Sequence, residues 1–268
     1  MKKVLPSLVL LISLSGFSQT PISEDQMQFK MDSIQKEANL LFGLENAAWK
    51  GTDYVTDLPN IKNAMGGYIT YHEKDAFVCS ILSKDYSKTL VRYYFDEKTG
   101  KLSNVNDKVK NISTTEKSLY EAKKEFINQI SKEDYGVIVP NDFNLNFIPI
   151  KRDKGFKIYI ITSSSDAYTI PFGNDYLFYL DSSYKITAHE RFHKSFVPSK
   201  TKHEGRNIVR CMHNHVLEYP YISATDICNF KLYAPFGKID EFSVISGSLK
   251  GIFTYKLSTD KLRFEPMD

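Results

Sequence analysis

The chain has 268 residues, of which 42% are hydrophobic, 13% aromatic and 25% charged. This composition is typical of a globular protein and excludes a disordered, collagen-like or coiled-coil chain. The formal net charge is +3, and it falls to +1 if Lys2 and Lys3 are removed with the leader described below. A nearly neutral chain has no electrostatic signature for nucleic acid or for an anionic membrane, so we expect neither partner.

Residues 1–18 have the pattern of a secretory signal peptide. Two lysines precede the apolar stretch Val4–Leu14, and small residues follow it up to Ser18. The stretch is shorter than the roughly 20 residues that a membrane-spanning helix needs. We expect cleavage before Gln19, with no membrane anchor because no cysteine lies near the cut. The mature protein is therefore predicted to be periplasmic or secreted.

The three cysteines are Cys79, Cys211 and Cys228. This odd number allows at most one internal disulfide in an oxidising compartment. A mature chain of this length can bury a large core without disulfides, so small buried thiols are the first expectation. A local disulfide between Cys211 and Cys228, or a soft metal ligand there, stays open.

Hydrophobic spacing in the first half of the mature chain predicts two helices and a group of antiparallel strands. One amphipathic helix is expected from Ser23 to about Leu44, and a second from Thr115 to about Ser131. Pro140 and the two residues after it interrupt the pattern and suggest a domain boundary. The expected strands between the two helices are Tyr68–Tyr71, Phe77–Leu82 and Thr89–Phe95.

The second half is predicted to consist mostly of strands, with a helix from Ala224 to about Tyr233. The fold class is therefore α+β or mixed α/β, with a signal peptide at 1–18, an N-terminal lobe at 19–140 and a second domain at 141–268. The expected strands are Asn144–Ile150, Phe156–Thr162, Tyr176–Leu180, Tyr184–Val197, Asn207–His213, Glu241–Ser246 and Gly251–Tyr255.

One histidine pair matches the His-Glu-x-x-His pattern of the zincin metallopeptidases: His189, Glu190 and His193. That chemistry needs a helix, because only there do residues four apart share one face. Here the segment alternates apolar and polar residues after a hairpin turn, as a strand does. Residues four apart in a strand are about 13 Å apart and cannot chelate one ion. The sequence therefore argues against a zincin.

A second pattern suits its predicted context. His213 and His215 lie two apart on an expected strand, so both side chains point to the same side of the sheet. Ser223 and Asp226 open the helix that follows. Two histidines and Asp226 form a three-ligand zinc set that leaves the fourth tetrahedral position for water. The spacing thus favours a catalytic Zn²⁺ site.

His213-x-His215 followed by Ser223-x-x-Asp226 resembles the metal-binding signature of the JAMM (MPN or JAB-type) zinc metallopeptidases, including their RadC-like branch. The resemblance covers about residues 173–255. It implies a JAMM-like C-terminal half with a mixed sheet and a helix after the His-x-His strand. It also implies that His213, His215 and Asp226 bind zinc and that Ser223 stabilises the oxyanion.

The chain departs from this family at two positions. Val216 stands where a proline is usual, and no glutamate lies at 173–177, where the family has its general base. Two carboxylates are rival candidates for that role: Asp175, close to the expected place, and Glu190, on the neighbouring strand.

Each candidate also has an ordinary structural interpretation. Ser223-x-x-Asp226 is a helix capping box, which by itself explains both residues. His193 is expected to be a surface or packed histidine. The alternative is that it reaches the site from the adjacent strand, either as a replacement ligand or as a partner that supports a ligand. The sequence thus predicts an exported zinc-dependent hydrolase that cleaves an amide or isopeptide bond in a peptide or protein substrate. The alternative is a non-catalytic exported binding protein with a vestigial or absent metal site.

Overall fold

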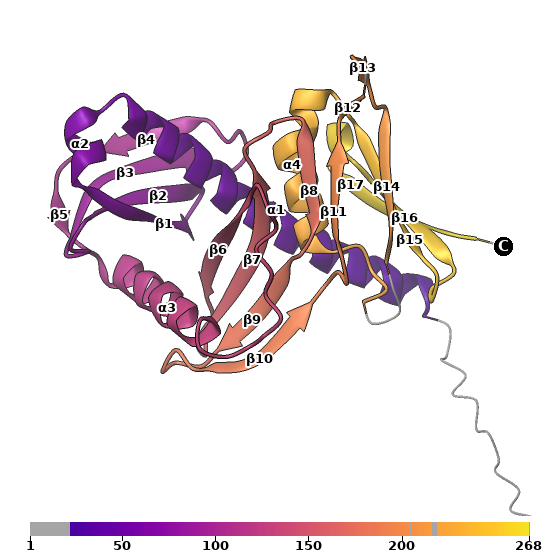
Figure 1. Cartoon of the computed structure of the whole chain (residues 1–268), viewed down its shortest axis with the longest axis horizontal. Coiled ribbons are helices and arrows are strands. Elements are labelled where there is room, and N and C mark those ends of the chain that lie inside the picture. The colour runs from indigo at the N-terminus through magenta and orange to yellow at the C-terminus, as the bar shows by residue number, and fades with distance from the viewer. Residues whose placement is uncertain (1–21, 204, 216–218, 268) are drawn as a thin grey trace, which may run out of the picture.

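The computed structural model describes residues 22–203, 205–215 and 219–267 (Figure 1). The predicted signal peptide and its cleavage site lie outside these residues. The fold is a mixed α+β arrangement, which confirms the predicted class. Within the described part of the chain, no helix combines the length and the apolar character needed to cross a membrane. Cys79, Cys211 and Cys228 are buried free thiols, as the first expectation had it.

The N-terminal sheet is an antiparallel meander with the strand order β1-β2-β3-β4, and the short β5 also pairs with β3. It confirms the meander expected between the two predicted helices. The elements of this part are α1 (Glu24–Thr56), α2 (Pro59–Ala64), β1 (Met65–Glu73), β2 (Ala76–Ser83), β3 (Lys88–Asp96), β4 (Leu102–Asn106) and β5 (Lys110–Asn111).

The middle sheet has the order β10-β9-β7-β6, and a two-stranded sheet β11-β8 lies beside it. Helix α3 packs between the N-terminal and middle sheets, with Leu119, Ala122 and Phe126 buried in the cluster that joins them (Figure 1). The elements are α3 (Thr114–Ile130), β6 (Phe143–Lys151), β7 (Phe156–Ser164), β8 (Thr169–Gly173), β9 (Tyr176–Leu180), β10 (Ile186–Arg191) and β11 (Phe196–Lys200).

The C-terminal sheet has the order β14-β15-β16-β17, in which only β14 and β15 run parallel. Helix α4 makes the crossover between these two parallel strands, as a parallel connection requires. The elements are β12 (Lys202–His203), β13 (Arg206–Asn207), β14 (Arg210–His215), α4 (Ala224–Gly237), β15 (Glu241–Ser246), β16 (Gly251–Lys256), the short 3₁₀ helix η1 (Leu257–Thr259) and β17 (Lys261–Pro266).

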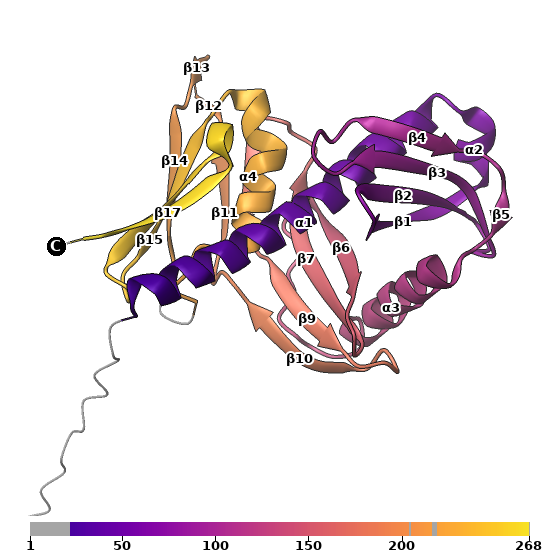
Figure 2. The ribbon, with the colours of Figure 1, turned by 180° about the vertical axis from the view of Figure 1, so that it is seen from behind.

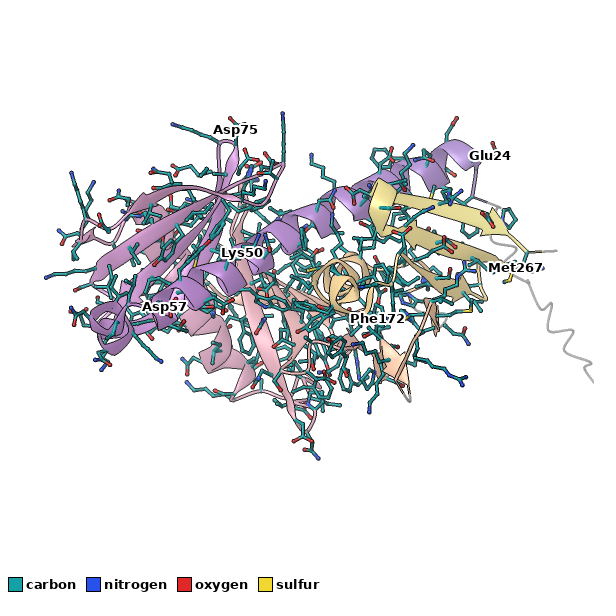
Figure 3. The ribbon with its side chains drawn as sticks, turned by 90° about the horizontal axis from the view of Figure 1, so that it is seen from above. Glu24, Lys50, Asp57, Asp75, Phe172 and Met267 are labelled. Atoms are coloured by element: carbon teal, nitrogen blue, oxygen red, sulfur yellow. The ribbon has the colours of Figure 1, made fainter. Side chains whose placement is uncertain are left out.

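Helix α1 is longer than predicted, since it continues past Leu44 to Thr56. Gly43 and Gly51 allow this, because a Cβ added at either would clash with the β2 side chains of Phe77 or Cys79. The helix crosses the molecule from the C-terminal sheet to the N-terminal one (Figures 2 and 3). One buried hydrophobic cluster therefore contains side chains from both sides of the boundary predicted near residue 140.

The predicted strand Tyr184–Val197 is wrong as a single element. The chain forms β10, leaves the middle sheet at residues 192–195 and pairs again as β11 with β8. Phe192 and His193 are consecutive and both buried, so the alternation of a one-sided strand ends there. Strands β4, β5, β8, β12 and β17 were not predicted.

Glu45 of α1 is a buried carboxyl that accepts a hydrogen bond from Asn146 Nδ2 at 2.6 Å. Burial raises its pKa to about 7, and Asn146 and Lys123 offset only part of that rise. Because the folded state holds this proton more tightly than the unfolded chain does, stability falls as pH rises from about 4.5 to about 7.

Glu45→Gln is therefore expected to stabilise the protein above pH 7 by up to about 3 kcal/mol and to have little effect at pH 4. Urea unfolding at both pH values measures this difference. Equal effects of the substitution at the two pH values would contradict the assignment.

Candidate metal centre

Strand β14 places two histidines on one side of the C-terminal sheet. Cys211, His213 and His215 are buried while the residues between them are exposed, and the strand pairs in parallel register with β15. The Nε2 atoms of His213 and His215 lie 3.2 Å apart. The rings of Phe172 and Phe242 pack against the His213 imidazole and fix its orientation. The predicted common face of the two histidines is thus present.

Asp226 lies in the first turn of α4 and belongs to its capping box. Ser223 Oγ accepts from the Asp226 amide at 3.0 Å, and Asp226 Oδ2 accepts from the Ser223 amide at 3.0 Å and its hydroxyl at 2.8 Å. Asp226 Oδ1 receives no hydrogen bond from the described residues and faces Nε2 of His193 and of His213 at 3.2 and 3.4 Å. Oδ2 also lies 3.2 Å from His215 Nε2. Asp226 therefore caps the helix through Oδ2 and faces the histidines with both carboxylate oxygens.

His193 joins this group, which corrects the expectation of a surface or packed histidine outside the site. Its Nε2 lies 3.3 Å from Nε2 of His213 and 2.7 Å from that of His215. The ligand atoms of His193, His213, His215 and Asp226 all lie within 4.8 Å of one another, and all four residues are buried. This group, here called the metal cluster, could hold a metal ion.

The spacing of the donor atoms fits a tetrahedral ion. Zinc bound at roughly 2.0–2.1 Å separates its ligand atoms by roughly 3.3–3.4 Å. Among the three Nε2 atoms and Asp226 Oδ1, four of the distances are 3.2–3.4 Å, and that between His193 and His215 is 2.7 Å. His215 Nε2 lies 3.2 Å from the other carboxylate oxygen, Asp226 Oδ2. A tetrahedral ion would therefore need the His193–His215 distance to widen and the Asp226 carboxylate to turn so that one oxygen faces all three imidazoles.

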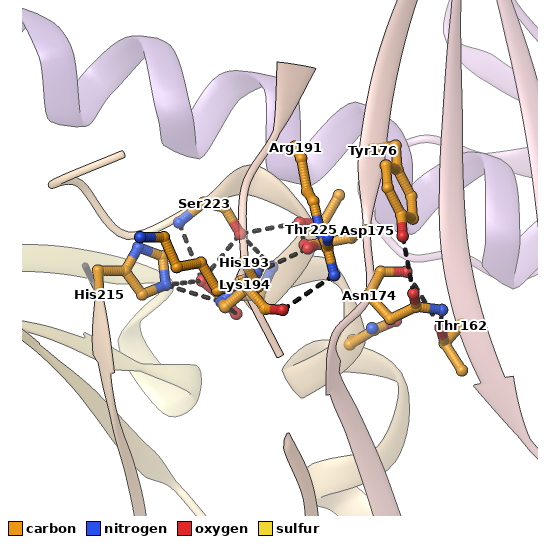
Figure 4. A network of polar contacts seen from close by, with 12 residues as sticks. Thr162, Asn174, Asp175, Tyr176, Arg191, His193, Lys194, His215, Ser223 and Thr225 are labelled. Carbon is orange, nitrogen blue, oxygen red and sulfur yellow. Dashed lines mark hydrogen bonds and ion pairs between the residues drawn. The ribbon is translucent and has the colours of Figure 1, made fainter. Parts of the chain in front are cut away.

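Asp175 lies on the opposite edge of the His193 ring from the other three cluster residues. Its Oδ1 is 2.6 Å from His193 Nδ1, while Thr225 Oγ1 donates to its Oδ2 (Figure 4). A carboxylate that accepts from Nδ1–H fixes the tautomer in which Nε2 is free to bind a metal. Both oxygens of Asp175 are thus engaged, and its contact with the cluster runs through the His193 ring.

The other two residues predicted to take part in catalysis lie in different surroundings. Ser223 is fully buried, and its hydroxyl contacts Asp226 and, at 2.8 Å, Thr225 Oγ1. Glu190 is exposed on β10, where Tyr179 Oη donates to it at 3.3 Å, and it is not part of the metal cluster. The general-base and oxyanion roles of these residues stay predictions.

The His-Glu-x-x-His segment is a strand that ends in a bend, so the argument against a zincin holds. His189 is exposed, stacks on Phe178 and lies outside the metal cluster. His193 alone contributes to the cluster. The two histidine patterns of the sequence therefore meet at one site through a single shared residue.

The charges of the cluster favour a cation. Burial alone would lower the pKa of His193, but Asp175 and Asp226 outweigh it and raise that pKa well above 6.5. Burial would raise the pKa of Asp226, but His193 and His213 hold it well below 3.8. A divalent ion bound by three neutral imidazoles would balance the two buried carboxylates, Asp175 and Asp226.

Asp175→Asn is expected to weaken metal affinity roughly 10- to 100-fold without removing a ligand, because the carboxylate that orients His193 is lost. Competition with a chromophoric chelator measures this change. Asp166→Asn, at an exposed turn outside the cluster, is the control and should leave the affinity unchanged. Equal affinity of Asp175→Asn and the unchanged protein would show that the contact does not orient the ligand.

Comparison with known proteins finds no protein family and no curated protein that matches this chain.

Proposed function

We propose that this protein is an exported metalloprotein that binds one divalent transition metal ion, Zn²⁺ in the first place, through His193, His213, His215 and Asp226. The observation that carries this proposal is the convergence of four buried residues whose ligand atoms all lie within 4.8 Å of one another. Imidazole nitrogen and carboxylate oxygen are both established zinc donors.

The number of protein donors favours a structural role for the metal. Structural zinc sites are closed by four protein ligands, whereas catalytic sites keep one position for water or substrate. Here His193 is the fourth donor, and it would occupy the coordination position that a catalytic site with three protein ligands leaves for water. Of the three residues predicted for catalysis, Ser223 is a buried helix cap, Asp175 is bonded to His193, and Glu190 is exposed. This favours the alternative in which the exported protein is not a hydrolase.

A JAMM-like hydrolase acting on an amide or isopeptide bond is the second candidate function. The observation in its favour is the arrangement of His213-x-His215 on β14 and Ser223-x-x-Asp226 at the start of α4, which the resemblance implies. It requires the metal to accept a fifth ligand or to release His193. Export of the mature chain from residue 19 is part of both proposals and rests on the sequence pattern of residues 1–18.

Metal analysis of residues 19–268, without affinity histidines, tests the proposal. One metal ion per chain is expected, and His213→Ala/His215→Ala should lose it. His189→Ala is the matched control, because His189 is exposed outside the cluster, and it should keep the metal. A purified protein that takes up no zinc, manganese, iron, cobalt or nickel would refute the proposal.

A screen of the zinc-loaded protein against peptide and isopeptide substrates separates the two candidates. Turnover that disappears in His213→Ala/His215→Ala supports the hydrolase. Zinc binding without turnover supports the structural site.

A further inference from the structure

The four cluster residues come from two separate parts of the fold. His213, His215 and Asp226 belong to β14 and α4, which are consecutive elements of the C-terminal unit, and β14 pairs with β15, the strand that follows α4. His193 instead comes from residues 192–195, the bend between β10 of the middle sheet and β11 of the small sheet. Three donors therefore form one local set, and the fourth is added from outside it.

The bend that carries His193 is held close to the turn between β8 and β9. Phe192 donates its amide to Asp175 O at 3.3 Å, and Arg191 Nη2 donates to Lys194 O at 2.9 Å. Gly173 has φ +77°, and a Cβ there would lie 2.3 Å from Ser195 O. The absence of a side chain at Gly173 lets the bend approach the cluster, and Asp175 then fixes the ring of His193.

We propose that His193 is the closing ligand of the site: it sets the metal's coordination number, and without it the remaining residues form an open three-ligand centre that accepts a small exogenous donor. This inference rests on the proposed metal binding and adds the division of labour among the ligands. His213, His215 and Asp226 hold the ion, and His193 excludes water and other donors from its fourth position.

Replacing His193 by glycine removes the whole imidazole from a buried position and leaves a space of the same shape. Asp175 loses its partner there, since its Oδ1 contacts His193 Nδ1. Added imidazole can fill that space and restore both contacts, one to the metal and one to Asp175. Rescue by imidazole therefore tests the closing role and the orienting contact at once.

The experiment uses residues 19–268 loaded with Co²⁺, whose visible absorption distinguishes four-coordinate from five- or six-coordinate centres. The unchanged protein is expected to give an intense four-coordinate spectrum that neither azide nor imidazole alters. His193→Gly is expected to keep one Co²⁺ per chain with a shifted absorption, because a solvent oxygen replaces the imidazole, to bind azide, and to recover the spectrum of the unchanged protein with imidazole. Its metal affinity should fall by more than the roughly 10- to 100-fold that loss of an orienting partner alone causes.

Two further variants make the result decisive. His189→Gly, on the preceding strand β10 and exposed outside the cluster, should behave as the unchanged protein does. His193→Asn, whose amide can still bond to Asp175 while being too short to reach the metal, should also bind azide, and it replaces His193→Gly if the glycine variant does not fold.

The possible failures are distinguishable. If the unchanged protein binds no metal, the proposed function fails. If it binds Co²⁺ but the His193 variants keep its spectrum and remain unresponsive to azide, metal binding stands and the closing role is refuted. An azide response in the unchanged protein equally refutes the closing role.

Discussion

Removing the metal is expected to lower the melting temperature of the mature protein by roughly 8–16 °C when the metal is present at about a thousand times its dissociation constant. Binding to the folded state alone at that ratio stabilises it by about 4 kcal/mol. For a protein of this size, each kcal/mol changes the melting temperature by roughly 2–4 °C. The unfolded chain keeps no preformed site, so nearly all the binding free energy contributes to folding.

Differential scanning calorimetry with and without a chelator measures this effect, and added Zn²⁺ should reverse it. His213→Ala/His215→Ala is the matched control, since a protein that cannot bind the metal should melt at the same temperature with and without the chelator. A shift of the same size in that variant would mean that the chelator acts elsewhere.

Removal of the metal should destabilise the region around the metal cluster before it unfolds the whole protein. His193 links the bend after β10 to β14 and α4, so hydrogen exchange should increase first in residues 192–200 and around the first turn of α4 when the metal is removed. Helix α3, which packs in a different core cluster, should keep its protection until global unfolding. Uniform loss of protection across both regions would contradict a structural role confined to the site.

Three of the four cluster residues could be predicted because a local pattern in the sequence marks each of them. Alternation along β14 puts His213 and His215 on one face, and the capping signal places Asp226 in the first turn of the next helix. The sequence left open whether Asp226 caps the helix or binds the metal. In the structure its carboxylate can do both. Ser223 bonds to Oδ2, while Oδ1 faces His193 and His213 and Oδ2 also faces His215.

His193 could not be predicted in the same way, because its position depends on where the chain leaves the middle sheet. The alternating pattern from residue 184 to 197 gives no sign of the bend, and the contact of His193 with Asp175 joins two strands by tertiary packing. The burial of both Phe192 and His193, which marks the bend, is visible only in the folded chain. Likewise, the length of α1 depends on Gly43 and Gly51 meeting β2, which no helical periodicity reveals.

Glu116→Ala is expected to destabilise the protein by about 3–5 kcal/mol at pH 7, because it leaves Arg92 buried without its partner. Arg92 donates to Glu116 from Nε at 2.7 Å and from Nη2 at 2.8 Å, and the Glu116 side chain is fully buried. Glu116 also accepts from the Ser113 amide at 2.8 Å, which caps α3. One substitution thus breaks a buried ion pair and the capping box of a helix between two sheets.

The effect should depend on pH with a definite sign. Burial would raise the pKa of Glu116, but hydrogen bonds, chiefly from Arg92, lower it from 4.5 to about 2. A depressed pKa in the folded state contributes stability above the unfolded value and loses it as pH falls through the folded one. The difference between the unchanged protein and Glu116→Ala should therefore be largest above pH 5 and shrink between about pH 4.5 and pH 2.

Urea unfolding of matched variants separates the pair from general effects on α3. Glu121→Ala lies on the same helix but forms only a solvent-exposed pair with Lys124 at 3.3 Å, so it should change stability by less than about 1 kcal/mol. Arg92→Met/Glu116→Leu removes both charges and fills the space with apolar atoms, so it should be much less destabilised than Glu116→Ala. If the double variant is as unstable as Glu116→Ala, the loss of stability comes from the helix cap and from packing. If the double variant is more stable, the loss of stability in Glu116→Ala comes from the uncompensated charge of Arg92.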